Sequence, residues 1–359
     1  MVYEFATFCK DFEKYSERKG LRVLKCYING NHYTGIMSDG TRIRATRETD
    51  DDRFLYDFAE NCDVKITNHC TTGCPFCHEG SSKDGKHADL NLPIFDTWKP
   101  GTEIAIGGGN VLDHPDLIPF LTRLKKQEVV CNITVNQRAV DEQYTLLQKI
   151  VTENLVNGVG ISITDPLNEK QMKAVNDLYE DTGCRNFVCH VIVGIVDKNF
   201  IPVLQGRKVL FLGYKNNVGR GVSYNEQNEI KIKENTEWLI NNLKDLSTKF
   251  QVMSFDNLAL AQLDAKNVLG LSEEEWKLRF QGKDYGDVNG TEAPSTFYFD
   301  AVNQTIGRSS TQPYNERVKY SGQTFEEAFK VSLSNYKINE DQYGELKLSE
   351  VNYHEAKAP

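Results

Sequence analysis

The feature that most constrains this chain is an alternation of short apolar runs and amphipathic segments between residues 63 and 250. The runs are typical of strands, and the segments between them carry apolar residues at helical spacing. Strands joined in this way by helices pack into a parallel sheet. We predict an α/β fold in which a partial (β/α)6 barrel forms from strands at 63–67, 103–106, 131–135, 159–163, 187–193 and 208–212.

The segments on either side of this barrel follow other patterns. Before it, an aromatic stripe predicts a helix over 3–16, and strands at 21–28, 33–37 and 41–46 are separated by Asn29-Gly30 and Asp39-Gly40, which favour hairpin turns. After it, we predict strands at 296–300 and 305–309 and a helix at 325–336. The predicted domains are a helix with a β-meander (1–60), the barrel (61–256) and an α+β extension (257–359).

Charge and composition limit the function classes. The formal net charge of −9 argues against a broad nucleic-acid surface, which needs clustered Lys and Arg, but leaves room for a local basic groove. No apolar run approaches the roughly 20 residues of a membrane span, and the N-terminus lacks a signal-peptide pattern. Nine cysteines without such a signal predict reduced thiols in a cytoplasmic protein rather than a disulfide framework.

Three of the cysteines stand together directly after the first predicted barrel strand. Cys70, Cys74 and Cys77 have the spacing C-x3-C-x2-C, at the strand end where parallel α/β folds bind ligands. Three thiolates on one loop can hold three corners of a cubane iron–sulfur cluster and leave the fourth iron open. Alternatively, His69 or His78 can complete a four-ligand zinc site.

This cysteine spacing after a first parallel strand resembles the signature of the radical SAM superfamily, and the resemblance covers residues 61–256. It implies a [4Fe–4S] cluster on Cys70, Cys74 and Cys77, with S-adenosylmethionine (SAM) bound to the open iron. It also implies an electron donor such as flavodoxin or ferredoxin. In that family, the reduced cluster cleaves SAM, and the 5′-deoxyadenosyl radical removes a hydrogen atom from the substrate.

The resemblance extends to residues that would contact SAM near the cluster. Phe76, before the third motif cysteine, would touch the adenine. Gly107, Gly108, Gly109 and Asn110 match by position the Gly-Gly-Glu element that holds the methionine amino group. Gly109 departs from the usual Glu, so backbone carbonyls or Asn110 would take over that role. A glycine run is by itself also typical of a tight turn or an anion cradle.

Further SAM contacts are implied at the ends of later strands. Asn136, Ser162 and Thr164 would meet the ribose and carboxylate, although Asn and Ser in such places also serve as helix caps. Val193 would belong to an adenine wall, and Leu212 would add backbone contacts to adenine. Between these strands, Asp165-Pro166 predicts the start of a helix.

The loop after the last predicted strand supplies candidate catalytic residues. Tyr214, Lys215 and Arg220 lie there, and both cations would point into the barrel mouth and bind a carboxylate or phosphate, unless the loop is simply solvated. Cys184 and Cys189 are too few for a second cluster, and no cysteine follows them. We therefore expect one cluster, with Cys131, Cys184 and Cys189 as small buried side chains.

The leading hypothesis is a radical SAM enzyme that acts on a peptide, protein or small amino-acid-like substrate, with no membrane partner. Residues 296–310 resemble the start of the C-terminal extension of peptide-modifying members, with Ser where Cys might stand. One alternative is modification of a nucleoside or nucleic acid, which needs a basic rim from Lys215, Arg220, Arg42, Arg44 and Arg47. Another is a non-catalytic zinc-binding adaptor.

Overall fold

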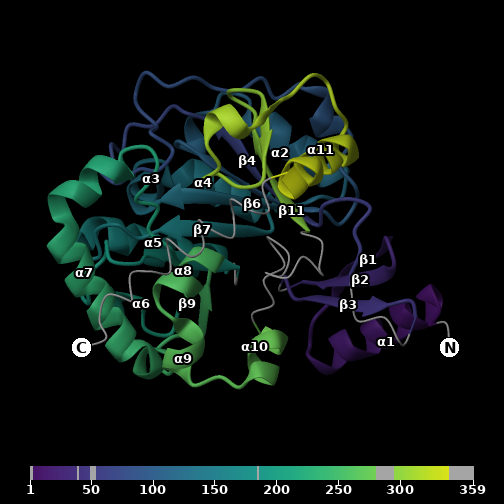
Figure 1. Cartoon of the computed structure of the whole chain (residues 1–359), viewed down its shortest axis with the longest axis horizontal. Coiled ribbons are helices and arrows are strands. Elements are labelled where there is room, and N and C mark those ends of the chain that lie inside the picture. Colours follow the sequence, from purple (N-terminus) through teal and green to yellow (C-terminus); the bar gives the residue numbers. More distant parts are fainter. Residues whose placement is uncertain (1–2, 39, 49–53, 184–185, 280–294, 339–359) are drawn as a thin grey trace.

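The computed structural model describes residues 3–38, 40–48, 54–183, 186–279 and 295–338. Helix α1 (Phe5–Arg18) packs on an antiparallel sheet of β1 (Val23–Asn29), β2 (His32–Met37) and β3 (Arg42–Thr46). The ring of Phe12 lies on Gly35 of β2, where a Cβ atom would come within 2.5 Å of it. This packing confirms the predicted helix and meander, which lie at the lower right of Figure 1.

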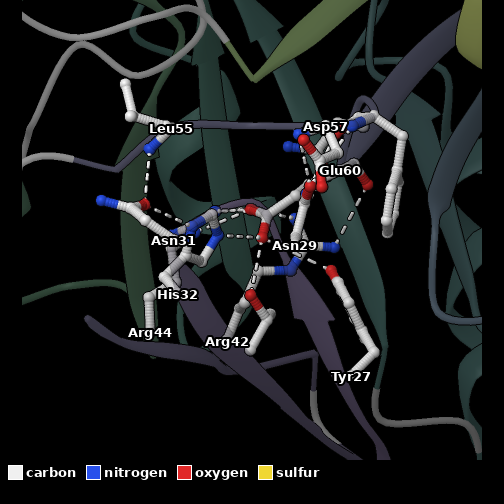
Figure 2. Close-up of polar contacts among 12 residues, drawn as sticks. Tyr27, Asn29, Asn31, His32, Arg42, Arg44, Leu55, Asp57 and Glu60 are labelled. Carbon is white, nitrogen blue, oxygen red and sulfur yellow. Dashed lines mark hydrogen bonds and ion pairs between the residues drawn. The ribbon is translucent and has the colours of Figure 1, made fainter. Parts of the chain in front are cut away.

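A buried carboxylate attaches this N-terminal sheet to the rest of the molecule (Figure 2). Glu60, just before β4 (Asn61–Thr67), accepts hydrogen bonds from Arg44 Nε at 2.7 Å and from Thr34 Oγ1 at 2.8 Å. His32 Nε2 lies 3.4 Å from Glu60 Oε1, and Arg42 donates to the Asn61 side chain at 2.8 Å. Both arginines of β3 are therefore engaged at the start of β4.

The main sheet has ten strands among the described residues, in the order β10-β9-β8-β7-β6-β5-β4-β11-β12-β13. Strands β4 to β10 are parallel and adjacent in chain order, and β10 and β13 are edges, so the sheet does not close. This confirms the α/β fold with a partial barrel. The bounds are β5 (Glu103–Gly108), β6 (Val130–Asn136), β7 (Gly158–Ser162), β8 (Phe187–Ile192), β9 (Lys208–Leu212) and β10 (Val252–Phe255).

Two details of the barrel differ from the sequence analysis. Strand β10 was not predicted, because its run Val-Met-Ser-Phe is only four residues long and too short to be told from its surroundings by pattern. Helix α5 does not start at Asp165-Pro166 but at Glu169, where Asn168 caps it by accepting from Gln171 N at 3.2 Å. Gln137 instead holds the backbone of Asp165 on both sides, with Oε1 accepting from its N–H at 3.0 Å and Nε2 donating to its carbonyl at 2.7 Å.

Helices connect the strands and cover the outer side of the sheet (Figure 1). Along β6, every second residue is buried beneath them, whereas Asn132, Thr134 and Asn136 on the other face are half-buried. The helices are α2 (Leu117–Lys126), α3 (Gln137–Glu142), α4 (Tyr144–Thr152), α5 (Glu169–Thr182), α6 (Phe200–Leu204), α7 (Gly221–Leu246), α8 (Asn257–Gln262), α9 (Ala265–Leu269) and α10 (Glu273–Arg279). Short 3-10 turns lie at Pro93–Asp96, Val111–Asp113 and Tyr314–Glu316.

The predicted C-terminal hairpin and helix are present, and the hairpin continues the barrel sheet. Strand β11 (Thr296–Asp300) runs parallel to β4, with Thr296 opposite Asn61. Strands β12 (Thr305–Gly307) and β13 (Val318–Lys319) follow antiparallel. Helix α11 (Phe325–Ile338) packs through Phe325 on Phe297, with ring centroids 5.4 Å apart.

The helices and the isolated cysteines can be compared with the sequence predictions. No helix in the described part of the chain is long and apolar enough to cross a membrane. Cys131 and Cys189 are buried with free thiols, as predicted, whereas Cys184 lies outside the described residues.

Candidate functional site

The cysteine loop leaves the carboxyl end of β4 and folds back on itself. The backbone N–H of Cys70 donates to Ser82 O at 2.8 Å, and that of Asn68 donates to Lys86 O at 2.8 Å. Within the turn, Cys77 N donates to Cys74 O at 3.2 Å, and Gly73 has a φ of +67°. Because Gly tolerates this left-handed conformation, the loop turns sharply, as predicted. The thiols of Cys70, Cys74 and Cys77 are free and half-buried.

The three thiols influence one another electrostatically. Burial raises the pKa of Cys74 to about 11, the neighbouring Cys77 and Cys70 add to the rise, and the Arg220 guanidinium opposes it. A group of crowded thiols becomes thiolate when a metal or cation offsets the negative charge. In kind and number, these donors fit a cluster that takes three thiolates.

Both histidines beside the motif lie next to charged side chains. His78 Nε2 lies 3.3 Å from Glu79 Oε1 and 3.4 Å from Lys215 Nζ, and His69 Nε2 lies 3.6 Å from Asp113 Oδ2. Burial lowers the pKa of His78, with Lys215 adding to this effect. Among the residues that the structure describes, no three His, Cys, Asp or Glu side chains are gathered as ligands around one ion.

The glycine run at the end of β5 packs directly on the cysteine loop. Gly109 N donates to Thr67 O at 2.7 Å, and Asn110 N donates to His69 O at 2.8 Å. A Cβ atom would lie 2.3 Å from Thr67 O at Gly108 and 2.1 Å from His69 O at Gly109, but would meet nothing within 4 Å at Gly107. Two of the three glycines thus permit close packing, and Gly107 faces open space.

The side chain of Asn110 is used inside the protein. Its Oδ1 accepts from Leu112 N at 3.3 Å, which caps the 3-10 turn at Val111–Asp113, and its Nδ2 donates to Gln143 Oε1 at 2.9 Å. Asn110 is 9% exposed. Both polar groups of this side chain thus have protein partners, and the contacts of Asn110 and of the backbone carbonyls with the SAM amino group stay predictions.

Asn136 and the loop after β7 lie side by side at the same end of the sheet. Asn136 pairs in register with Ser162, and its Nδ2 donates to Thr164 Oγ1 at 3.3 Å. Its Oδ1 caps α3 by accepting from Arg138 N at 2.9 Å. Asn136 is therefore a helix cap that also reaches the neighbouring strand end. Gln137, which the sequence analysis did not single out, is fully buried and fixes Thr164 by accepting from its N–H at 2.8 Å.

The residues expected near the adenine come from three separate segments. Phe76 is half-buried, and its ring meets that of Tyr224 on α7 edge to face at 5.6 Å. Val193 N donates to Leu212 O at 2.9 Å, so the ends of β8 and β9 are joined. The adenine roles of these residues stay predictions.

The three candidate catalytic residues all brace the loop between β9 and α7. Tyr214 is buried, and its hydroxyl donates to Gly221 O at 2.6 Å. Lys215 Nζ donates to Ser310 Oγ at 2.8 Å. Arg220 donates from Nε to Cys74 O at 2.9 Å and from Nη1 to Ser81 O at 2.8 Å. Each side chain is thus occupied with protein partners.

A buried ion network beneath the cysteine loop was not foreseen. Lys65 Nζ lies 2.8 Å from Glu79 Oε2 and 3.4 Å from Asp300 Oδ2, and Arg317 Nη1 lies 3.6 Å from Asp300 Oδ2. Tyr298 of β11 donates to Glu79 Oε1 at 3.4 Å. The pairing of β11 with β4 brings these groups together, and the C-terminal hairpin thereby contacts the segment that follows Cys77.

Comparison with known proteins confirms the fold. No protein-family model matches the chain, and no curated protein is similar to it in sequence. Two solved structures of Streptococcus suis SuiB are similar, one bound to S-adenosylmethionine and one bound to the precursor peptide SuiA. Each gives a TM-score of 0.50 at 11% identity and covers 76% of this chain and 64% of the SuiB chain. The match therefore spans less than two thirds of SuiB, and at this identity it concerns the fold alone.

Proposed function

We propose that this chain is a radical SAM enzyme that modifies a peptide. The observation that carries the proposal is the cysteine loop. Three free thiols lie on the loop that follows the first strand of an open parallel barrel, and the glycine run of the next strand packs against the backbone at the start of that loop. The fold similarity to a protein solved with SAM bound agrees with this arrangement.

In this proposal, Cys70, Cys74 and Cys77 hold a [4Fe–4S] cluster, whose open iron takes SAM. When bound and reduced, the cluster and SAM supply a radical that removes a hydrogen atom from the substrate. The chain itself holds and orients these groups. The carbonyls at Gly107 and Gly108 receive the amino group, the ends of β6 and β7 at Asn136 and Ser162 receive the ribose and carboxylate, and the ends of β8 and β9 face the adenine.

A peptide is the substrate class with the most support. SuiB, whose fold this chain shares, is known in complex with its precursor peptide. The nucleic-acid alternative needs a basic rim, but two of its expected members, Arg42 and Arg44, are paired with Glu60 at the amino end of β4. That end is opposite the cysteine loop. The available cations at the mouth are therefore fewer than the sequence indicates.

The test is anaerobic preparation of the chain with iron and sulfide, followed by reduction in the presence of SAM. We expect about four irons per chain, a brown colour and release of 5′-deoxyadenosine. Cys74→Ala should lose both cluster and cleavage, whereas Cys131→Ala, which removes a buried thiol outside the loop, should keep both. A colourless wild-type chain with one zinc would support the adaptor and overturn the proposal.

The glycine run offers a second test that separates ligand binding from folding. Gly107→Ala meets open space, so the apoprotein should keep its stability, yet the added methyl group should weaken SAM binding at least several-fold. Gly109→Ala should instead displace the cysteine loop, because its Cβ would lie 2.1 Å from His69 O. Calorimetry with SAM and thermal unfolding of each variant distinguish the two effects. Unchanged SAM affinity in Gly107→Ala would exclude this edge as the binding place.

A further inference from the structure

Resting on the proposed function, we propose that Arg220 is a positioning residue for the cluster. Its side chain holds the cysteine loop by the backbone, and its charge raises the reduction potential of whatever cluster the loop carries. From its place in the sequence, Arg220 is predicted to point into the barrel mouth and bind a carboxylate or phosphate. The contacts of its side chain assign it a different task.

Arg220 reaches the cysteine loop through three hydrogen bonds. Its backbone N–H donates to Cys77 O at 2.9 Å, its Nε donates to Cys74 O at 2.9 Å, and its Nη1 donates to Ser81 O at 2.8 Å. Two of these acceptors belong to motif cysteines, and the third lies four residues after the last of them. A planar guanidinium with several fixed donors suits this task, which a lysine cannot reproduce.

The backbone next to Arg220 is pressed against the same loop. Gly219 has a φ of +56°, and a Cβ atom there would lie 2.3 Å from His78 O and 2.6 Å from Cys77 O. The hydroxyl of Tyr214 closes the β9–α7 loop on Gly221, and Gln262 exchanges hydrogen bonds of 2.9 Å with both backbone groups of Tyr214. A firmly held loop therefore carries Arg220 into contact with the cysteines.

The charge of Arg220 is available to the thiolates. The two hydrogen bonds of its guanidinium go to neutral backbone carbonyls, Cys74 O and Ser81 O, so these contacts bring its positive charge to the cysteine loop without neutralising it. A cluster bound by thiolates is anionic, and reduction makes it more so. A fixed cation nearby, together with hydrogen bonds and limited solvent, therefore favours the reduced form.

A second arginine provides a matched comparison. Arg138 also interacts electrostatically with Cys70 and Cys74, but its hydrogen bonds among the described residues go to Asn136 and Glu142 and not to the cysteine loop. Its Nε is 2.7 Å from Glu142, and 42% of its side chain is exposed, so solvent and a carboxylate screen its charge. Removing Arg138 thus removes a positive charge that lies farther from the cysteines and leaves the hydrogen bonds of Arg220 to the cysteine loop unchanged.

The experiment compares Arg220→Gln, Arg220→Lys and Arg138→Gln with wild type, each reconstituted anaerobically with iron and sulfide. The readouts are circular dichroism of the apoprotein, iron and sulfide per folded chain, and the midpoint potential from an EPR-monitored redox titration without SAM. We expect Arg220→Gln to retain several-fold less iron and to have a more negative potential. Arg220→Lys should restore the potential more than the iron content, and Arg138→Gln should resemble wild type in both.

The outcomes separate this inference from the proposed function. A wild-type chain that takes up no cluster contradicts the proposed function itself. A wild-type cluster with equal iron content and equal potential in Arg220→Gln overturns the role of Arg220 alone. An equal shift of the potential in Arg138→Gln and Arg220→Gln also overturns it, because general charge would then explain the effect.

Discussion

The two ends of β4 carry buried ion networks of similar chemistry and different consequence. At the amino end, Glu60 is fully buried and paired with Arg44 and Arg42 of the meander. At the carboxyl end, Lys65 is paired with Glu79 and with Asp300 of the hairpin. Each network ties a flanking segment of the chain to the first barrel strand.

The two networks differ in whether they lie next to the cysteine loop. The side chains that contact Glu60 come from the meander (Tyr27, His32, Thr34, Arg42 and Arg44), and none of the residues labelled in Figure 2 is a cysteine. Glu79, by contrast, is two residues from Cys77, so the carboxyl-end network is continuous with the proposed cluster loop. A buried ion pair alone is thus weak evidence for a functional site. Whether it belongs to such a site depends on the residues next to it.

Breaking the amino-end network should give the largest loss of stability. In Glu60→Gln, Arg44 keeps a buried charge without its carboxylate, which costs about 3 kcal/mol in the free energy of unfolding. The control Glu128→Gln removes a carboxylate that is 62% exposed and paired with Lys25, and should cost less than about 1 kcal/mol. Urea unfolding of the apoproteins measures both. Iron per folded chain should stay at the wild-type level in each.

Breaking the carboxyl-end network should affect stability and cluster together. Lys65→Met leaves Glu79 and Asp300 with fewer cationic partners, and we expect a loss of about 2–3 kcal/mol. Because Glu79 is close to Cys77, iron per folded chain should also fall. Lys170→Met, whose lysine is 81% exposed and paired with Asp141, is the matched control and should change neither quantity. Normal iron retention in folded Lys65→Met would contradict the expectation that only the carboxyl-end network of β4 affects the cluster.

The strands of the barrel could be predicted from the sequence, whereas the two ion networks could not. Apolar runs located β4 to β9, and the cysteine spacing located the loop, because both signals are local in the chain. Lys65 and Asp300 meet only because β11 pairs with β4, a long-range contact that no short pattern encodes. The start of α5 was misplaced for the same reason, since Gln137, the first residue of α3, fixes the backbone of Asp165.

Acid should weaken the amino-end network in a defined direction. Burial alone would raise the pKa of Glu60, but the contact with His32 and the charges of Arg44 and Arg42 outweigh it and hold that pKa well below its usual range. A carboxyl with a depressed folded pKa contributes stability above its unfolded pKa of about 4.3 and loses it as the pH falls further. Apoprotein unfolding between about pH 6 and pH 3 should therefore have a shallower pH slope in Glu60→Gln than in wild type. Equal slopes would show that Glu60 titrates normally.

Two glycines test how closely the β9–α7 loop packs against the cysteine loop at the carboxyl end of β4. The expected difference in stability is the smallest of those considered. Gly219 and Gly206 both have positive φ values, +56° and +75°, so alanine at either one costs about 1 kcal/mol from backbone strain alone. Only at Gly219 would the new Cβ collide with the backbone of His78, whereas nothing lies within 4 Å at Gly206. Gly219→Ala should therefore lose more stability than Gly206→Ala by about 1 kcal/mol and also retain less iron. If the two variants have equal stability and bind equal iron, the β9–α7 loop can shift to accept the new Cβ without displacing the cysteines. The packing of Gly219 against the cysteine loop would then matter no more than that of a glycine in an ordinary surface turn.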